Sequence, residues 1–370
     1  MAARRAFLKP VLKPLHEQVI VITGATSGIG LATARKAADA GAAVVLTARN
    51  DVALAELTAE LRARGARAIA VAVDIGAPGA AEEIAFAAES AFGDIDTWVN
   101  NAGVSIYGRL EDTPIEDQRR LFETDYWGLV RGSMTAVKRL RAGQGGALIN
   151  VGSVLSDQAL PIQGAYSAAK HAVKGFTNAL RMELMRDAPG VSITLIKPSS
   201  IDTPYKLHAR NFLPGPATNP PPVYSADLVA DAILYAAEHP IRELTVGGGG
   251  RLLAAFGQLM PRLAEPILAW TIPGLSRDIA KNHPDGDSDA LFEPGRDLSE
   301  RSRYPMVRRR SLYTRAQMNP DTTALVAGVL IAGLILTLKT RRALKDHGIR
   351  REARAAAKAR YAPKPIQHAG

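Results

Sequence analysis

Residues 18–30 read QVIVITGATSGIG, and this stretch decides the fold of the chain. Its first half is apolar and β-branched, as in a buried strand, and a glycine-rich turn then leads into a helical pattern at 31–40. Glycines let a backbone approach a pyrophosphate closely, and the first N–H groups of a helix bind anions. The stretch therefore predicts a strand, a phosphate-binding turn and a helix, although an ordinary tight turn would use the same glycines.

Strand and helix patterns keep alternating after this turn. Apolar strand patterns at 43–48 and 67–73 are separated by a helical pattern at 52–64, and another helical pattern follows at 78–92. Parallel strands need such crossover helices, which cover both faces of the sheet. We therefore predict an α/β fold with a Rossmann-type, doubly wound parallel sheet and a C-terminal helical extension.

A tyrosine and a lysine, Tyr166 and Lys170, lie one helical turn apart, and Ser153 precedes them. Tyrosine has an ordinary pKa of about 10, and a lysine on the same helix face favours the phenolate. Such a pair can exchange a proton with an alcohol or carbonyl oxygen. The plainer interpretations are a half-buried ring beside a solvated ammonium, and a serine that caps a turn.

The order of these motifs resembles that of the short-chain dehydrogenase/reductases, over residues 15–250. The matching residues are Thr23, Gly24, Gly28, Gly30, Asp74, Asn100, Asn101, Ala102, Gly103, Ser153, Tyr166, Lys170, Pro198 and Thr203. The resemblance implies a Rossmann-type sheet, a nicotinamide dinucleotide, and catalysis by the matching Ser, Tyr and Lys.

The resemblance also implies a role for each match. Tyr166 would donate a proton in reduction and accept one in oxidation, while Lys170 would lower the Tyr166 pKa and bind the nicotinamide ribose. The residues expected to bind the cofactor are Thr23, Gly24, Ser27, Gly28, Ile29, Gly30, Arg49, Asp74, Asn101, Ala102, Gly103, Tyr166, Lys170, Pro198 and Thr203. Asp74 resembles the residue that contacts the adenine, but a turn-capping role stays open for it, as a turn role does for Asn101.

Asp125 departs from the family pattern, which has an asparagine that helps to hold a water in the proton relay behind the lysine. An ionised aspartate accepts hydrogen bonds but cannot donate them. Its charge would pair with Lys170 and weaken the effect of Lys170 on Tyr166, or its pKa would rise until it stays protonated. We therefore include Asp125 in the catalytic set and expect it to slow turnover. A milder departure is Ser199 after Pro198, where the family often has glycine.

The end of the second predicted strand indicates the cofactor. An NAD site places an acidic side chain there for the ribose 2′-hydroxyl, whereas a 2′-phosphate needs a positive charge. This chain has Ala48 at that position and Arg49 directly after it, with Asp51 nearby. We predict a preference for NADP over NAD. The alternative is that Arg49 is a solvated residue at the start of the next helix.

The sequence indicates the class of substrate less directly than it indicates the cofactor. A proline-rich connection at 199–223 stands where the family carries its substrate lid, and its apolar residues favour an apolar substrate. The chain has no cysteine, which excludes disulfides, thiolate metal sites and cysteine nucleophiles, and no metal-binding spacing is evident among its seven histidines. We expect no metal and no signal peptide, because residues 1–14 lack a long apolar core.

We divide the chain into six parts. They are an N-terminal arm at 1–15, a dinucleotide-binding domain at 16–250, an apolar helical extension at 251–282, a flexible linker at 283–320, a membrane helix at 321–340 and a basic tail at 341–370.

The membrane prediction rests on residues 322–338, which carry no charge. As a helix they would span about 26 Å, slightly less than the roughly 30 Å of hydrocarbon in a bilayer. Residues 301–370 hold 16 Lys and Arg against 3 Asp and Glu. Ten of those basic residues lie between 339 and 364, where they oppose export of the tail, so a helix in the membrane interface is an alternative. A buried or subunit-interface helix is another.

Together these features predict a membrane-associated oxidoreductase on the cytoplasmic face, preferring NADP, that interconverts a carbonyl and a secondary alcohol on an apolar, lipid- or steroid-like molecule. The alternative function is a dinucleotide-binding scaffold or sensor that turns over little because of Asp125. A soluble cytoplasmic enzyme whose tail forms a homo-oligomer is a further alternative. We expect no nucleic-acid partner, because the basic tail has few stacking aromatics.

Overall fold

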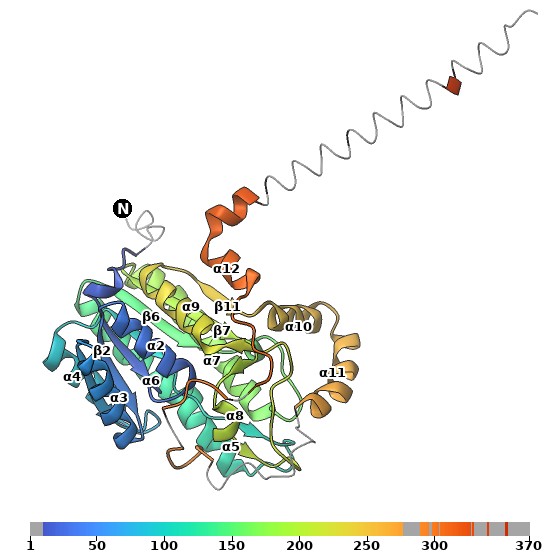
Figure 1. The fold of residues 1–370 in the computed structure, drawn as a ribbon, viewed down its shortest axis with the longest axis horizontal. Coiled ribbons are helices and arrows are strands. Elements are labelled where there is room, and N and C mark those ends of the chain that lie inside the picture. The colour runs from blue at the N-terminus through green and yellow to red at the C-terminus, as the bar shows by residue number, and fades with distance from the viewer. Residues whose placement is uncertain are drawn as a thin grey trace, which may run out of the picture. The chain divides into compact units, whose positions relative to one another are not determined.

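The computed structural model describes residues 10–276, 289–295, 298–302 and 304–326, and the single residues 328, 339, 352 and 353. The chain divides into two compact units, Met1–Met318 and Asn319–Gly370. All the strands and helices that bear on the candidate site belong to the first unit, which is shown in Figure 1.

Seven parallel strands form the central sheet, in the order β11-β7-β6-β4-β1-β2-β3. Their bounds are β1 Val19–Thr23, β2 Ala43–Ala48, β3 Ala68–Ala72, β4 Thr97–Asn100, β6 Gly146–Val151, β7 Val191–Pro198 and β11 Glu243–Val246. Two short parallel pairs lie outside this sheet: β5 Ile106–Tyr107 with β9 Arg210–Asn211, and β8 Ile201–Asp202 with β10 Tyr224–Ser225. The predicted doubly wound parallel sheet is confirmed.

Helices cover both faces of the sheet (Figure 1). Their bounds are α2 Gly28–Asp39, α3 Asp51–Ala63, α4 Ala80–Phe92, α5 Ile115–Phe122, α6 Leu129–Ala142, α7 Gly164–Asp187, α8 Tyr205–His208, α9 Ala226–Glu238, α10 Gly248–Leu259, α11 Pro261–Leu275 and α12 Leu312–Met318.

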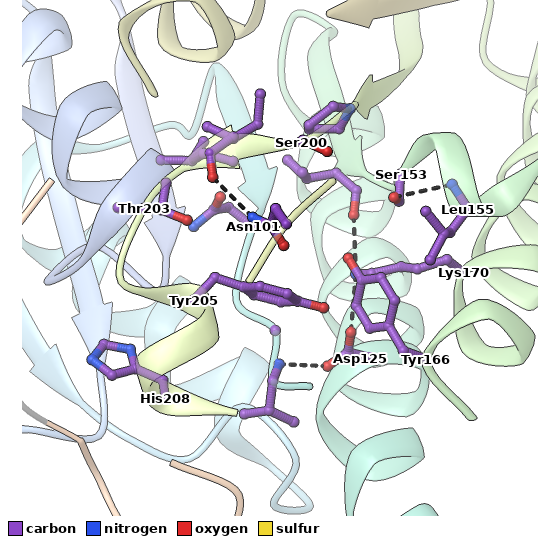
Figure 2. A pocket seen from close by; sticks show the side chains of 18 of the residues that line it. Asn101, Asp125, Ser153, Leu155, Tyr166, Lys170, Ser200, Thr203, Tyr205 and His208 are labelled. Carbon is purple, nitrogen blue, oxygen red and sulfur yellow. Dashed lines mark hydrogen bonds and ion pairs between the residues drawn. The ribbon is translucent and has the colours of Figure 1, made fainter. Parts of the chain in front are cut away.

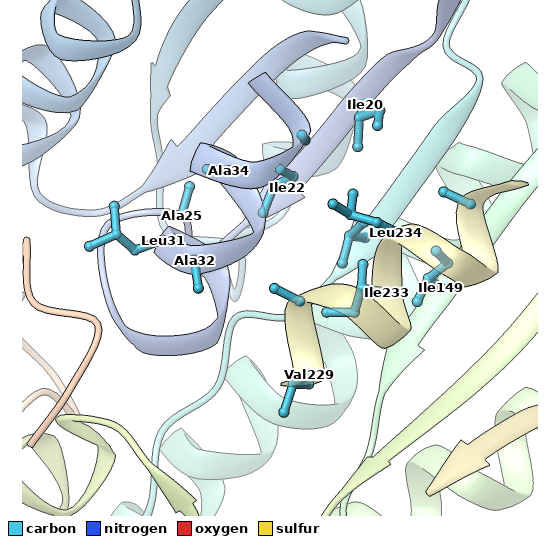
Figure 3. Close-up of a cluster of buried hydrophobic side chains, with 14 of the residues drawn as sticks. Ile20, Ile22, Ala25, Leu31, Ala32, Ala34, Ile149, Val229, Ile233 and Leu234 are labelled. Atoms are coloured by element: carbon cyan, nitrogen blue, oxygen red, sulfur yellow. The ribbon is translucent and has the colours of Figure 1, made fainter. Parts of the chain in front are cut away.

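Strand β1 is apolar on both sides because helices bury both of its faces. Ile20 and Ile22 pack in one cluster with α2 and α9, which Figure 3 shows. Val19 and Val21 point the other way, into a cluster with α4 and α6. A half-exposed strand would alternate apolar and polar residues, so the continuous apolar run at 19–22 already indicates a central strand.

The order of the strands reverses beside β1. The chain adds β2 and β3 on one side of β1, and β4, β6, β7 and β11 on the other. In such sheets a crevice opens at the carboxyl ends of the strands where the order reverses, and ligands bind there. The fold therefore places the glycine turn after β1 and the loop after β4 at the same crevice.

The compact unit does not end at residue 250. Helices α10 and α11 form the expected apolar helical extension, and residues 289–295, 298–302 and 304–318 continue on the same unit. The N-terminal arm also contacts this unit from residue 10 on, since Lys13 Nζ lies 2.6 Å from Asp96 Oδ1.

The expected flexible linker at 283–320 is corrected in its described parts. Leu291 is fully buried, Ser302 donates to the Asp202 carboxylate at 3.0 Å, and the Arg308 N–H donates to the Val223 carbonyl at 2.8 Å. Its polar, glycine- and proline-rich composition resembles a linker because irregular backbone on a domain surface uses the same residues.

The helix predicted at 321–340 lies mostly outside the described residues, as does the basic tail at 341–370. Residues 320–326, which the structure does describe, are helical. Among the described residues, no helix combines the length and apolarity needed to cross a bilayer. The membrane segment therefore stays a prediction.

Candidate active site

A cavity of about 690 Å³ lies at the carboxyl edge of the sheet. Its lining includes the glycine turn, the ends of β2, β6 and β7, the loop after β4, the start of α7, and α10 and α11. Figure 2 shows the side chains at the centre of this cavity. All the predicted site residues line it except Gly30, which lies in the first turn of α2.

The glycine turn has no room for side chains. Gly24 and Gly28 have φ angles of +67° and +53°, which disfavour any residue with a Cβ. A Cβ on Gly30 would lie 2.0 Å from the Gly24 carbonyl oxygen. The turn therefore brings bare backbone to the cavity at the N-terminus of α2, which is where a pyrophosphate fits.

Asn101 and Thr23 hold this turn in place. The Asn101 Nδ2 donates to the Thr23 and Gly24 carbonyl oxygens at 2.9 and 3.3 Å. The backbone N–H groups of Asn101 and Ala102 both donate to Thr23 Oγ1 at 2.9 Å. The turn role that the sequence left open for Asn101 is therefore present in the structure.

Asp74 lines the cavity and is already engaged by two protein groups. Its Oδ1 accepts the Gly76 N–H at 2.9 Å, which is a turn cap, and its Oδ2 pairs with the Arg120 guanidinium. Sequence reasoning missed Arg120, which also donates from Nε to the Leu291 carbonyl at 2.9 Å. No local spacing indicates this contact, because α5 reaches Asp74 only in the folded chain.

Arg49 follows the last residue of β2 and faces the same end of the cavity. Its guanidinium donates to the carbonyl oxygens of Ala290 and Phe292 at 2.5 and 3.1 Å, and approaches that of Leu291 at 3.5 Å. These partners lie more than 240 positions away in the sequence. The Arg49 guanidinium is therefore bound by protein carbonyl groups from a distant segment, in contrast to the alternative of a solvated side chain.

Tyr166 and Lys170 lie on the first turns of α7 and both line the cavity. The Lys170 Nζ lies 5.4 Å from the centre of the Tyr166 ring and 3.4 Å from the Val151 carbonyl oxygen. The helical spacing in the sequence therefore brings the two side chains to the same place (Figure 2).

Asp125 lies behind this pair, on a π-helical turn at Glu123–Gly128 between α5 and α6. Its Oδ2 is 3.1 Å from Lys170 Nζ, and its Oδ1 accepts the Val104 N–H at 2.7 Å. The carboxylate is fully buried. Asp125 thus makes the direct ion pair with Lys170 that the sequence allowed.

Burial controls the pKa values at this site. Burial raises the pKa of Tyr166, and the nearby Asp125 adds to the rise, although the Lys170 charge opposes both. Lys170 does lower the Tyr166 pKa, as expected, but desolvation of the phenolate outweighs this effect and leaves the pKa raised. Burial lowers the pKa of Lys170, but the charges of Asp125 and Tyr166 outweigh it and leave that pKa raised. Lys170 therefore stays protonated.

Ser153 combines the two roles that its position allowed. Its Oγ accepts the Leu155 N–H at 3.1 Å, which caps a short helix at Val154–Ser156. The same side chain lines the cavity and lowers the pKa of Tyr166. Because Oγ accepts the N–H, its own hydrogen can be donated to another oxygen.

Tyr205 is a second phenol at the site that sequence reasoning missed. It opens α8, two residues after Thr203, and its ring centre lies 5.5 Å from that of Tyr166 at 64°. Its hydroxyl is buried, and its interaction with Tyr166 lowers the pKa of that phenol. The signal available in the sequence was its place in the expected lid, directly after Thr203 and Pro204.

Thr203 lies against the glycine turn, since a Cβ added to Gly28 would lie 3.0 Å from the Thr203 Cβ. Taken together, the cavity offers bare backbone at a helix N-terminus, a cation at the end of β2, and a phenol beside an ammonium. These groups fit the phosphates, the ribose and the nicotinamide of a dinucleotide in that order.

Comparisons with known proteins agree with this geometry. A family profile described as short chain dehydrogenase matches residues 18–212. An uncharacterized oxidoreductase, YxnA, of Bacillus subtilis is 44% identical over 87% of this chain and 91% of its own length.

Two solved structures share the fold. A short chain dehydrogenase/reductase from Burkholderia phymatum, in complex with NAD, has a TM-score of 0.62 and 26% identity, over 68% of this chain and 96% of its own. An alcohol dehydrogenase from Thermococcus sibiricus, complexed with 5-hydroxy-NADP, has a TM-score of 0.55 and 26% identity, over 62% of this chain and 95% of its own.

Proposed function

Because the chain belongs to the short-chain dehydrogenase/reductase family, we propose that this oxidoreductase interconverts a carbonyl and a secondary alcohol on an apolar small molecule, with NADP as the preferred cofactor. The observation that carries the proposal is the meeting of Tyr166, Lys170 and Ser153 in one cavity with the glycine turn. The bound dinucleotide would supply or accept the hydride.

The protein's own residues would manage the proton. Tyr166, a neutral phenol in this buried site, donates its proton to the carbonyl oxygen in reduction and recovers one in oxidation. Lys170 carries a positive charge beside the ring and stabilises the phenolate that forms. Ser153 can donate a hydrogen bond to the same substrate oxygen and so hold it near Tyr166.

The preference for NADP rests on Arg49. It lines the cavity directly after Ala48, which takes the place of the acidic residue that would bind a ribose 2′-hydroxyl. A guanidinium suits a phosphate because it forms paired, charge-assisted hydrogen bonds. The two solved relatives hold different dinucleotides, so the preference is argued from this side chain.

The apolar substrate is inferred from the helices beside Tyr166. Leu252, Leu253 and Phe256 of α10 line the cavity, and Leu268 and Ile272 of α11 continue the same wall. Leu155 and Leu160 complete it next to α7. A substrate that reaches Tyr166 past these side chains would bury mainly carbon.

A series of ketones that differ only in alkyl length tests this function. With purified protein and NADPH, we expect kcat/KM to rise by about fourfold for each methylene that enters the wall, as burial of that group predicts. Small polar carbonyls reduced as well as the longest ketones would contradict an apolar substrate. NADPH that binds without turnover of any carbonyl would instead favour the sensor, which the Asp125–Lys170 pair makes a real alternative.

A further inference from the structure

Residues 289–295 and 298–302 cross the adenosine end of the cavity, and we call these residues the strap. The chain is drawn in orange here in Figure 1. Ala290, Pro294 and Gly295 line the same cavity as Arg49 and Asp74. The ends of β2 and β3 are where a dinucleotide places its adenosine half in this type of sheet. The strap is therefore an outer wall of the adenosine end.

The strap fixes the position of Arg49. Three successive carbonyl oxygens, those of Ala290, Leu291 and Phe292, surround the guanidinium at 2.5 to 3.5 Å. Carbonyl groups are neutral, so they orient the guanidinium without cancelling its charge. A 2′-phosphate would need both that charge and that orientation.

The strap also touches the glycine turn. The Leu298 N–H donates to the Thr26 carbonyl at 2.7 Å, and the Gly28 N–H donates to the Ser299 carbonyl at 2.9 Å. Gly28 is the first residue of α2, and the N–H groups at this end of the helix are the donors that a pyrophosphate uses. The strap and a bound pyrophosphate would therefore meet at one group of donors.

A few side chains anchor the strap to the domain. Leu291 is fully buried in a cluster with Val104 and Leu121. Asp289 pairs with Arg210 at 2.8 Å. At the other end of the strap, Glu300 pairs with Arg35 and the Ser302 hydroxyl donates to Asp202. Residues 292–294 between these anchors are exposed, so loss of the Leu291 anchor would loosen the first part of the strap.

We propose that the strap is part of the dinucleotide site: it holds Arg49 for the 2′-phosphate, and a bound dinucleotide leaves only when the strap lifts from the glycine turn. This inference rests on the proposed dinucleotide-dependent function. It assigns to the strap the rate of cofactor release and a share of the choice between NADP and NAD.

The test compares two leucines that are both fully buried, Leu291 in the strap and Leu140 in α6. In the full-length protein, we expect Leu291→Ala to speed the release of NADPH, followed by fluorescence in a stopped-flow instrument, by at least about tenfold. Leu291→Ala should also lower the ratio of the NADP affinity to the NAD affinity. Leu140→Ala removes the same atoms from the cluster that α4 and α6 form against the sheet. It should leave both the release rate and the affinity ratio unchanged.

A reporter on the strap gives a second measurement. The chain has no cysteine, so a single cysteine from Glu293→Cys, at an exposed position, can carry an environment-sensitive dye. The dye signal should change when NADPH binds and return at the rate at which NADPH is released.

The outcomes separate this inference from the proposed function. The proposed role of the strap is overturned if Leu291→Ala and the parent release NADPH at the same rate. It is also overturned if Leu140→Ala accelerates the release as much as Leu291→Ala does. So does a dye that does not respond to saturating NADPH. Failure of the parent protein to bind either NADPH or NADH would overturn the proposed function itself.

Discussion

The two ends of the cavity are built in different ways. At the catalytic end, Tyr166 and Lys170 stand one turn apart on α7, and Asp125 reaches them from the helical segment before it. At the adenosine end, Arg49 is held by carbonyl groups more than 240 positions away. The positions of the groups that exchange the proton therefore follow from local helical spacing. The position of Arg49, in contrast, depends on the strap, which follows the last strand of the sheet in the sequence.

Tyr166→Phe would break the catalytic end alone. It removes the group that donates the proton but keeps the ring, so we expect kcat/KM to fall by about 10²–10⁴-fold. The affinity for NADPH should change little, because the adenosine end is untouched. Steady-state rates and a binding titration on the same preparation measure the two effects.

Tyr235→Phe is the matched control, since Tyr235 lies on α9 and stacks on His239. Activity that survives Tyr166→Phe would mean that another group, with Tyr205 as the nearest phenol, moves the proton.

Arg49→Ala would break the adenosine end. A charge-assisted hydrogen bond contributes about 1.5–3 kcal/mol, so the ratio of kcat/KM for NADPH to that for NADH should fall by about 10- to 150-fold. Arg49→Lys keeps the charge but loses the planar fork, and we expect an intermediate ratio. The ratio isolates the 2′-phosphate, because once the Arg49 guanidinium is gone any loosening of the strap affects both cofactors alike. An unchanged ratio in both variants would place the selectivity elsewhere.

Asp125→Asn sharpens the account of the catalytic end. In oxidation Tyr166 acts as a base, so the rate rises as pH increases through its pKa. The charge of Asp125 helps to raise that pKa, and a neutral asparagine removes this contribution. The rising limb of the pH profile should therefore move to lower pH, and each unit of movement corresponds to about a tenfold rate difference below the limb.

Asp157→Asn is the control for this substitution. Asp157 is also buried and paired, with Lys174 and Lys197, but it does not contact Lys170. Asp157→Asn should lower the free energy of unfolding without shifting the rising limb of the pH profile. A limb that stays in place in Asp125→Asn would mean that Asp125 is already protonated, in line with the effect of burial, which raises its pKa.

The same comparison explains what the sequence could predict. The bounds of β2 agree with the strand predicted at 43–48 because a continuous apolar run between turn residues indicates a buried strand. The pairing of Tyr166 with Lys170 follows from the period of a helix. The raised pKa of Tyr166 could not be predicted, because it depends on burial by segments that are distant in the sequence.

The adenosine end was harder to predict for a related reason. The contact of Arg120 with Asp74 and the strap across Arg49 join segments with no shared pattern. The strap is polar and rich in glycine and proline, so its composition favours a linker. Its fully buried leucine, Leu291, was the available signal, but a single leucine is too common to indicate a contact.

Glu300→Gln should have the smallest effect and would sharpen the account of the strap. Glu300 pairs with Arg35 of α2 at 2.7 Å at the far end of the strap, and both side chains are partly exposed. Such pairs contribute about 0.2–1 kcal/mol, and Arg35 keeps its second partner, Glu60. We therefore expect NADPH release to accelerate by no more than about fivefold. Asp231→Asn removes a comparable pair, with Lys36 on the same helix, and should leave release unchanged. An effect of Glu300→Gln as large as that of Leu291→Ala would show that the strap is held by its charged end rather than by its buried leucine.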